Sequence, residues 1–221
     1  MTDVAAAVAA VRARIAAAAA RAGRDPGSVT HVAATKTVPA DRIAAALVAG
    51  VRDVGENRAQ ELLAKAPALT GASPRWHFLG PLQRNKVKAL ARWVTCWQTI
   101  DRVAVGAAVA RHAPGARVLV EVNLGDEPQK AGCAPDETSA LVDALRALGL
   151  VVDGLMAVPP LGADPRPFFA RLRQLAARDA LPELSMGMTD DFEIAVEEGA
   201  TLVRVGRALF GERPQPQVPQ Q

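Results

Sequence analysis

Residues 31–39, with the sequence HVAATKTVP, place a lysine where a strand is predicted to end. Small and β-branched residues favour a short buried strand here, and Pro39 cannot continue a β-ladder. A helical pattern begins directly afterwards, at Asp41. Lys36 is therefore expected at the carboxyl end of the first strand, where α/β sheets and barrels keep their chemistry. Most lysines at strand ends simply extend into water, so other parts of the chain must decide its role.

Two glycine-containing loops late in the chain could hold a phosphate group. Residues 185–189 follow the seventh predicted strand, and residues 205–208 follow the eighth. In barrels the loops after the last two strands often bind phosphate, because glycine lets the backbone approach an anion and a helix start offers free N–H groups. The same residues could serve only as turn glycines and helix caps.

A lysine opposite a phosphate site suggests a Schiff base with a phosphorylated aldehyde. Pyridoxal 5′-phosphate (PLP) would fit, and so would the substrate of a class I aldolase. The amine must be deprotonated, which burial or a nearby cation favours. Arg204, on the last predicted strand, is costly in an apolar cup unless it is paired. It could donate to a pyridine nitrogen, and PLP held by an arginine in this way is a weaker electron sink than PLP with a carboxylate partner. Alternatively, it could form an ion pair with Glu121 or Glu193.

Eight predicted strands alternate with helical patterns, at about 25 residues per unit. This alternation predicts a (β/α)8 TIM barrel with an extra N-terminal helix at residues 3–22, forming one domain over residues 1–212. An open doubly wound sheet is the alternative, but no strand is followed by the G-x-G-x-x-G fingerprint. The Pro/Gln-rich tail, residues 213–221, is expected to be disordered. After the first, the predicted strands are residues 51–54, 75–79, 94–100, 117–123, 150–156, 183–185 and 201–205.

Composition excludes several classes of protein. The chain has 221 residues and a net charge of +3, with its basic residues scattered, which is not the footprint of a nucleic-acid-binding protein. No apolar stretch is long enough to span a membrane. Cys96 and Cys133 lie far apart, outside any zinc-ligand pattern, so we expect a reduced cytoplasmic protein without a metal site.

Six short motifs, taken in their order along the chain, resemble those of a known family. They closely resemble the PLP homeostasis protein family, the single-domain relatives of the alanine racemase N-terminal barrel, over about residues 5–212. Val54 and Thr189 are conservative departures from the family pattern, which usually has Phe and Ser there. The motifs are residues 33–37 (AATKT), 55–57 (GEN), 76–86 (WHFLGPLQRNK), 154–156 (GLM), 185–191 (SMGMTDD) and 203–206 (VRVG).

The resemblance implies a complete cofactor site. Lys36 would carry PLP as a Schiff base, and Arg204 would face the pyridine nitrogen. Lys130 matches a family lysine thought to help in handling the cofactor. The other residues implied to contact the cofactor are Asn57, His77 and Met156 around the ring, and Ser185, Gly206 and Arg207 at the phosphate.

The resemblance also implies the function: buffering and delivery of PLP inside the cell, with little or no turnover. The expected partners are PLP and PLP-dependent acceptor enzymes, and the expected state is a cytoplasmic monomer. An amino-acid racemase is the alternative, but its second base is a tyrosine brought by a β-rich domain. This chain contains no tyrosine and ends soon after the last strand, although His77 or Cys133 could replace that base. An aldolase would rely on Glu121.

Overall fold

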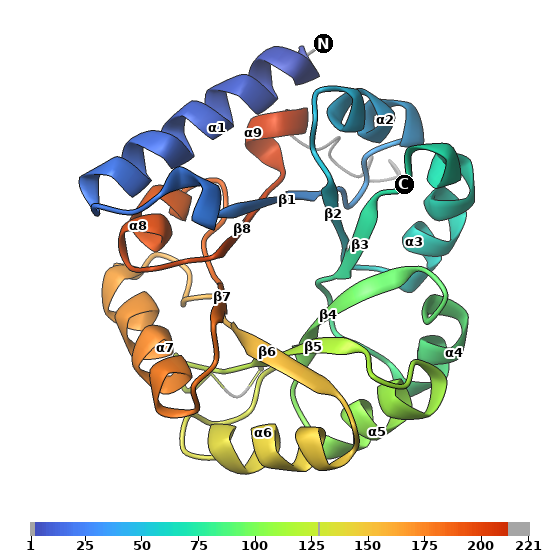
Figure 1. Ribbon diagram of the computed structural model, residues 1–221, viewed down its shortest axis with the longest axis vertical. Helices are drawn as coiled ribbons and strands as arrows, with labels where there is room; N and C mark the ends of the chain where they lie inside the picture. The colour runs from blue at the N-terminus through green and yellow to red at the C-terminus, as the bar shows by residue number, and fades with distance from the viewer. Residues whose placement is uncertain (1–2, 128, 212–221) are drawn as a thin grey trace, which may run out of the picture.

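The computed structural model describes residues 3–127 and 129–211, and these form a closed barrel of eight parallel strands. Neighbouring strands follow chain order, and β8 closes the ring against β1 (Figure 1). The predicted TIM barrel is therefore confirmed, whereas the predicted tail lies outside the described residues. The strands are β1 (Thr30–Ala34), β2 (Asp53–Glu56), β3 (Arg75–Phe78), β4 (Val94–Ile100), β5 (Arg117–Glu121), β6 (Val151–Met156), β7 (Glu183–Ser185) and β8 (Leu202–Val205).

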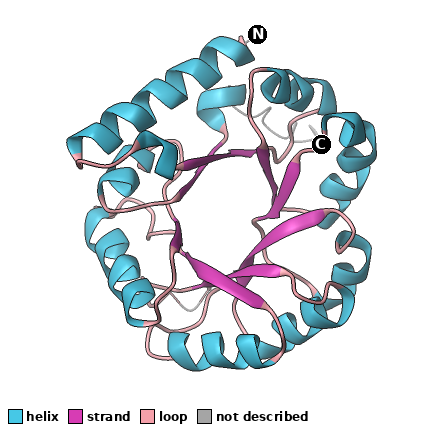
Figure 2. Ribbon diagram, viewed as in Figure 1, coloured by secondary structure: helices cyan, strands magenta, loops and turns pink. Residues whose placement is uncertain are grey.

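Helices form a continuous outer layer around the strands (Figure 2). They are α1 (Val4–Arg21), α2 (Ala40–Val48), α3 (Ala59–Lys65), α4 (Val87–Leu90), α5 (Val103–His112), α6 (Thr138–Ala147), α7 (Arg166–Arg178), α8 (Phe192–Glu197) and α9 (Arg207–Phe210). Short 3-10 turns are η1 (Pro26–Ser28), η2 (Ala66–Ala72) and η3 (Arg84–Lys86).

The predicted N-terminal helix is present as α1, which precedes the first strand and packs along α8, α9 and α2. Asp3 begins the helix because its carboxylate accepts hydrogen bonds from the N–H groups of Ala5, at 2.9 Å, and Ala6, at 3.2 Å. Val8, Val11 and Ile15 repeat at helical spacing and are all buried. This face therefore attaches α1 to the barrel.

The apolar core has two parts. The larger part lies between the strands and the helices, and the smaller part fills the inside of the barrel. The inner part is formed by Val32, Cys96, Leu119, Met156 and Leu202, from five different strands. These side chains close the barrel beneath its carboxyl-terminal end, which we call the barrel mouth.

Aspartate is a preferred N-cap residue, so the sequence predicts Asp101 as the N-cap of the helix that ends at His112, and this prediction is wrong. Helix α5 has Arg102 at its N-cap position, and the Asp101 carboxylate instead accepts a hydrogen bond from the Arg102 guanidinium at 2.7 Å. A charged donor next to the aspartate competes with the backbone N–H groups for the same oxygen. Other boundaries differ slightly: β2 begins at Asp53, and β5 ends at Glu121.

Within the described residues, no helix combines the length and the apolar character needed to cross a bilayer, and no cluster of metal-ligand side chains occurs. Both cysteines are buried and neither forms a disulfide. Burial raises the pKa of Cys96 to about 12 and that of Cys133 to about 11, so both thiols stay protonated at neutral pH.

Candidate functional site

Lys36 lies just past the end of β1, at the barrel mouth. Thr35 before it is completely buried, and Lys36 itself is half-buried. Thr37 after it adopts a φ of 64°, a left-handed conformation that is unusual for a β-branched residue. A hydrogen bond from the Val38 N–H to the Thr35 carbonyl, at 2.9 Å, closes this turn. The backbone that carries the lysine is therefore bent sharply at a strained residue.

A buried polar cluster beneath this turn is centred on Lys65, the last residue of α3. Its Nζ donates to the Thr35 carbonyl at 2.9 Å, to Glu56 Oε1 at 2.6 Å and to Glu61 Oε2 at 2.8 Å. Glu61 Oε2 also accepts from the Thr37 N–H at 2.7 Å. Both chain neighbours of Lys36 are thus held by one ammonium group and its carboxylate partner.

Burial raises the pKa of Glu56, and the hydrogen bonds from Lys65 and Thr35 oppose that rise. We expect Lys65→Met to destabilise the fold by about 3–5 kcal/mol, because it leaves the fully buried Glu56 carboxylate without its cation. Urea unfolding measures the change. Lys88→Met, at an exposed lysine of α4, is the control.

The double variant Lys65→Met/Glu56→Gln should regain most of the lost stability, because it removes the unpaired charge as well. If Lys65→Met costs no more than the Lys88→Met control, the cluster does not hold the turn.

Arg204 projects from β8 into the same mouth and is 6% exposed. Its guanidinium donates to Ser185 Oγ at 2.7 Å and to the Ala157 carbonyl at 3.0 Å. Burial lowers the pKa of Arg204 to about 10, and the carboxylates of Glu121 and Asp191 oppose that shift. The side chain therefore remains a cation at neutral pH.

Neither ion pair considered from the sequence forms. Glu193 binds Arg14 at 3.1 Å, and no described carboxylate lies within salt-bridge distance of Arg204. The hydrogen bonds to Ser185 and Ala157 use two of the five N–H bonds of a guanidinium, so this buried cation keeps donors for another acceptor at the mouth.

A chain of hydrogen bonds runs from Arg204 down through the inside of the barrel. Ser185 Oγ donates to Gln98 Oε1 at 2.6 Å, and Gln98 Nε2 donates to His77 Nδ1 at 2.7 Å. His77 Nε2 then donates to Asp53 Oδ1 at 2.9 Å. Both ring nitrogens of His77 are thereby occupied, and its two partners hold the ring in one tautomer.

Asp53 ends the chain at the opposite side of the barrel. Burial acts to raise the pKa of its carboxyl group, but hydrogen bonds from His77 and Arg75 outweigh burial and hold that pKa below its ordinary value. Asp53 is therefore a buried anion that fixes the position of His77.

Glu121, at the end of β5, has a pKa raised to about 7. Burial is the main cause, the nearby Asp101 adds to it, and Arg204 opposes it. The folded chain keeps this proton at pH values where the unfolded chain, with the ordinary pKa of 4.5, has lost it. Folded-state stability therefore falls as the pH rises between these two values, and it stays lower above them.

We expect Glu121→Gln to remove this loss of folded-state stability at higher pH. The variant should be more stable than the parent by about 1–3 kcal/mol at about pH 8 and similar to it at about pH 4. Urea unfolding at the two pH values measures the difference. An equal effect of the substitution at both pH values would show that Glu121 does not titrate in this range.

The two loops predicted to hold phosphate flank β8. Gly206 must stay small, because a Cβ there would lie 2.9 Å from the Ala34 carbonyl, and α9 begins at the next residue. The first N–H groups of a helix point out of its start, here beside the end of β8. Gly187, with a φ of 90°, is needed for packing instead, since a Cβ would lie 2.5 Å from that of Ala195.

The remaining predicted residues divide into two groups. Asn57 and Met156 lie at the ends of β2 and β6 and so share the mouth with Lys36. His77 lies deeper, within the hydrogen-bonded chain. Lys130 lies on the loop after β5, where its Nζ binds the Pro159 carbonyl at 3.1 Å and Glu127 at 2.5 Å.

Ser185 and Arg207 also have partners. The Ser185 hydroxyl binds Arg204 and Gln98, and the Arg207 side chain binds Asp190 at the surface. Their predicted role at the phosphate stays a prediction.

Comparisons with known proteins identify relatives of this chain. A family model described as the alanine racemase N-terminal domain matches residues 7–214. The PLP homeostasis protein of Pseudomonas aeruginosa is 42% identical over 223 residues, covering 96% of this chain and 97% of its own length. That of Deinococcus radiodurans is 45% identical over 210 residues, covering 92% and 99%.

Among solved structures, PipY of Synechococcus elongatus with PLP bound superposes with a TM-score of 0.79 at 36% identity, covering 89% of this chain and 100% of that chain. An alanine racemase of Corynebacterium glutamicum has a TM-score of 0.67 at 18% identity, covering 96% of this chain and 62% of that chain, which is a likeness of fold alone.

Proposed function

Because this chain belongs to the PLP homeostasis protein family, we propose that it binds PLP at the barrel mouth and takes part in buffering and delivering that cofactor. The observation that carries the proposal is the convergence of Lys36 and Arg204, from adjacent strands, beside the start of α9. These are the groups needed for an aldehyde, a ring nitrogen and a phosphate.

The described residues fit this cofactor. Lys36 would attach the aldehyde carbon through Nζ, and the turn held by Lys65 would keep that amine at the mouth. Arg204 has guanidinium donors left for a pyridine nitrogen. Asn57 and Met156 would line the ring, and the backbone around Gly206 would hold the phosphate together with Ser185 and Arg207.

Little or no turnover is expected from these residues. Bound PLP supplies an electron sink that stabilises negative charge on an attached amino acid. Arg204, still a cation at neutral pH, would donate to the ring nitrogen and oppose its protonation, which weakens that sink.

A racemase also needs a second base at the mouth. The sequence has no tyrosine, both ring nitrogens of His77 are occupied, and burial raises the pKa of Cys133 to about 11. Each of these observations favours a carrier over a racemase.

We further propose a cytoplasmic monomer whose partners are PLP and PLP-dependent acceptor enzymes. The two buried, unpaired cysteines support a reducing compartment. Light scattering of the purified protein tests the monomer.

The absorption spectrum of the purified protein tests the function. We expect a visible band from covalently held PLP, together with no racemised product in a chiral assay with amino acids. A colourless protein that gains no band when PLP is added would refute PLP binding, and steady racemisation would favour the enzyme.

A further inference from the structure

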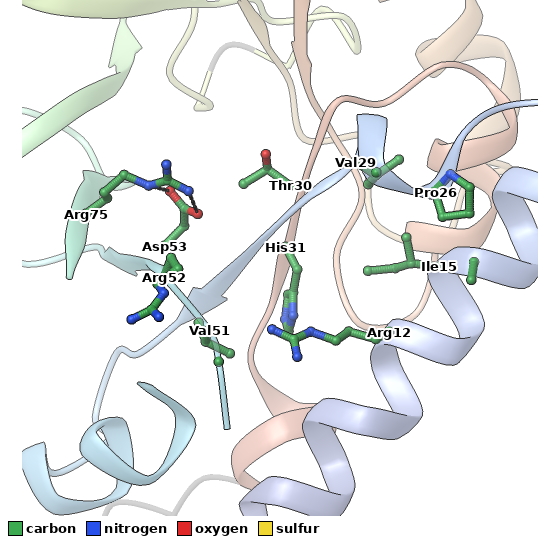
Figure 3. A pocket seen from close by; sticks show the side chains of 13 residues that line it. Arg12, Ile15, Pro26, Val29, Thr30, His31, Val51, Arg52, Asp53 and Arg75 are labelled. Atoms are coloured by element: carbon green, nitrogen blue, oxygen red, sulfur yellow. Dashed lines mark hydrogen bonds and ion pairs between the residues drawn. The ribbon is translucent and has the colours of Figure 1, made fainter. Parts of the chain in front are cut away.

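A cavity of about 460 Å³ opens at the end of the barrel opposite to the mouth (Figure 3). Thr30, Asp53 and Arg75 line it, and each is the first residue of its strand, β1, β2 or β3. Helix α1 supplies another wall with Arg12 and Ile15. Its volume lies within the usual range for small-molecule sites. Neither Lys36 nor Arg204 lines it, so this cavity is separate from the proposed PLP site.

The cavity carries an excess of positive charge. Arg12, Arg52 and Arg75 line it, against the single carboxylate of Asp53. Arg75 binds that carboxylate with two hydrogen bonds, of 2.8 and 2.6 Å, so their charges cancel. The Arg12 guanidinium donates to the Ala49 carbonyl, a neutral acceptor, at 3.1 Å. Arg12 and Arg52 therefore have no carboxylate partner among the described residues. Figure 3 shows their guanidinium groups on opposite sides of Val51, so Arg12, beside His31, is the cation placed to bind an anion in the cavity, and the exposed Arg52 adds positive charge nearby.

His31 supplies the uncommon feature of this site. Both of its ring nitrogens are buried and lack a hydrogen-bond partner among the described residues. Figure 3 shows the ring beside the Arg12 guanidinium. Burial lowers the pKa of His31 to about 4, with a further contribution from Arg12, so the ring is neutral and offers one donor and one acceptor. Buried polar groups without partners are rare and costly, and a ligand that pairs with them would remove that cost.

The other walls are apolar, with Ile15, Val29 and Val51 lining the cavity. Gly50, with a φ of 89°, lies against Arg12: a Cβ there would be 3.2 Å from the guanidinium. A side chain at this position would therefore crowd the arginine. The site combines guanidinium donors, a neutral imidazole and an apolar wall, and no lysine lines it that could form a covalent bond.

We propose that this cavity, the Arg12 pocket, binds a small phosphate monoester without a covalent bond. The phosphate binds Arg12, because a guanidinium group matches phosphate oxygens in geometry and charge, and the exposed Arg52 adds electrostatic attraction. The ester group lies on Ile15 and Val51, and His31 pairs with an oxygen of the ligand.

Calorimetric titration of the PLP-loaded protein with phenyl phosphate tests the proposal. We expect saturable binding of phenyl phosphate, weaker binding of inorganic phosphate and none of benzyl alcohol. Arg12→Gln should weaken binding by about tenfold or more, since it removes a charged hydrogen bond, and Arg52→Gln should weaken it by less, since it removes only nearby positive charge. Arg171→Gln, at an exposed arginine of α7 outside the cavity, is the matched control.

Absent binding, or equal affinity in the Arg12, Arg52 and Arg171 variants, would overturn the proposal. Equal affinity for inorganic phosphate would overturn the assignment to an ester, because the apolar wall would then contribute nothing.

Two further measurements distinguish binding in the Arg12 pocket from binding at the barrel mouth and test the part played by His31. The visible band of the PLP-loaded protein should stay unchanged as phenyl phosphate is added, and loss of the band would mean that the probe displaces PLP from the barrel mouth instead. His31→Phe should weaken binding by about tenfold without lowering the melting temperature, because the nitrogens it removes have no partner in the fold. Unchanged affinity would exclude His31 from the site.

Discussion

Lys36→Ala should abolish covalent attachment of PLP and with it the visible absorption band. The reason is chemical: only an amine can condense with the aldehyde, and we assign that amine to Lys36. The fold should persist, because hydrogen bonds at Thr35 and Thr37 hold the turn on both sides of the lysine. PLP should still bind reversibly, because the phosphate contacts and Arg204 remain.

Reduction with borohydride followed by intact-mass measurement checks this result. The parent should gain the mass of one reduced PLP group, and Lys36→Ala should gain none. Lys88→Ala, at an exposed lysine of α4, is the matched control. A full adduct on Lys36→Ala would move the attachment to another lysine.

Alternation of strands and helices was enough to predict the barrel. Period-2 and period-3.6 patterns depend on which face of an element is buried, and that information is local. For the same reason the sequence placed Lys36 and Arg204 at strand ends that lie together at the mouth, since parallel strands in a closed ring share one carboxyl-terminal end. The prediction from local sequence failed at Asp101, because its carboxylate accepts a hydrogen bond from the neighbouring Arg102 instead of capping α5.

Contacts across the barrel could not be predicted from one sequence. Ser185 and Gln98 are 87 positions apart, and nothing in either segment specifies the other as its partner. The hydroxyl of Ser185 is consequently part of the chain that holds Arg204, a role that its position beside a glycine loop did not suggest. A buried glutamine within an apolar strand was the available signal, because such a group needs a partner.

The buried position of Lys65 also could not be predicted from the sequence. Its spacing of four residues from Glu61 predicts a surface ion pair on one helix. The structure places the pair against the turn of Lys36 instead, where Lys65 is 12% exposed and Glu56 is fully buried. The depth of a polar residue depends on tertiary packing, which sequence spacing does not specify.

Arg204→Ala should weaken PLP binding by at least about tenfold and alter the spectrum of the bound cofactor. The substitution removes the charged donor that we assign to the ring nitrogen, and one such hydrogen bond is worth about 1.5–3 kcal/mol. It also frees Ser185 and the Ala157 carbonyl from their shared partner, so the phosphate side of the site loosens. Equilibrium titration with PLP, followed by absorption, measures both effects.

Arg204→Lys provides the comparison that separates charge from geometry. A lysine keeps the positive charge, but it lacks the planar fork that reaches Ser185 and Ala157 together. We therefore expect Arg204→Lys to bind PLP with intermediate affinity, and Arg204→Ala to raise the pKa of Glu121 further, because the cation that opposes its rise is gone. Parental affinity and an unchanged spectrum in Arg204→Ala would mean that this buried cation only holds the barrel interior and does not contact the cofactor.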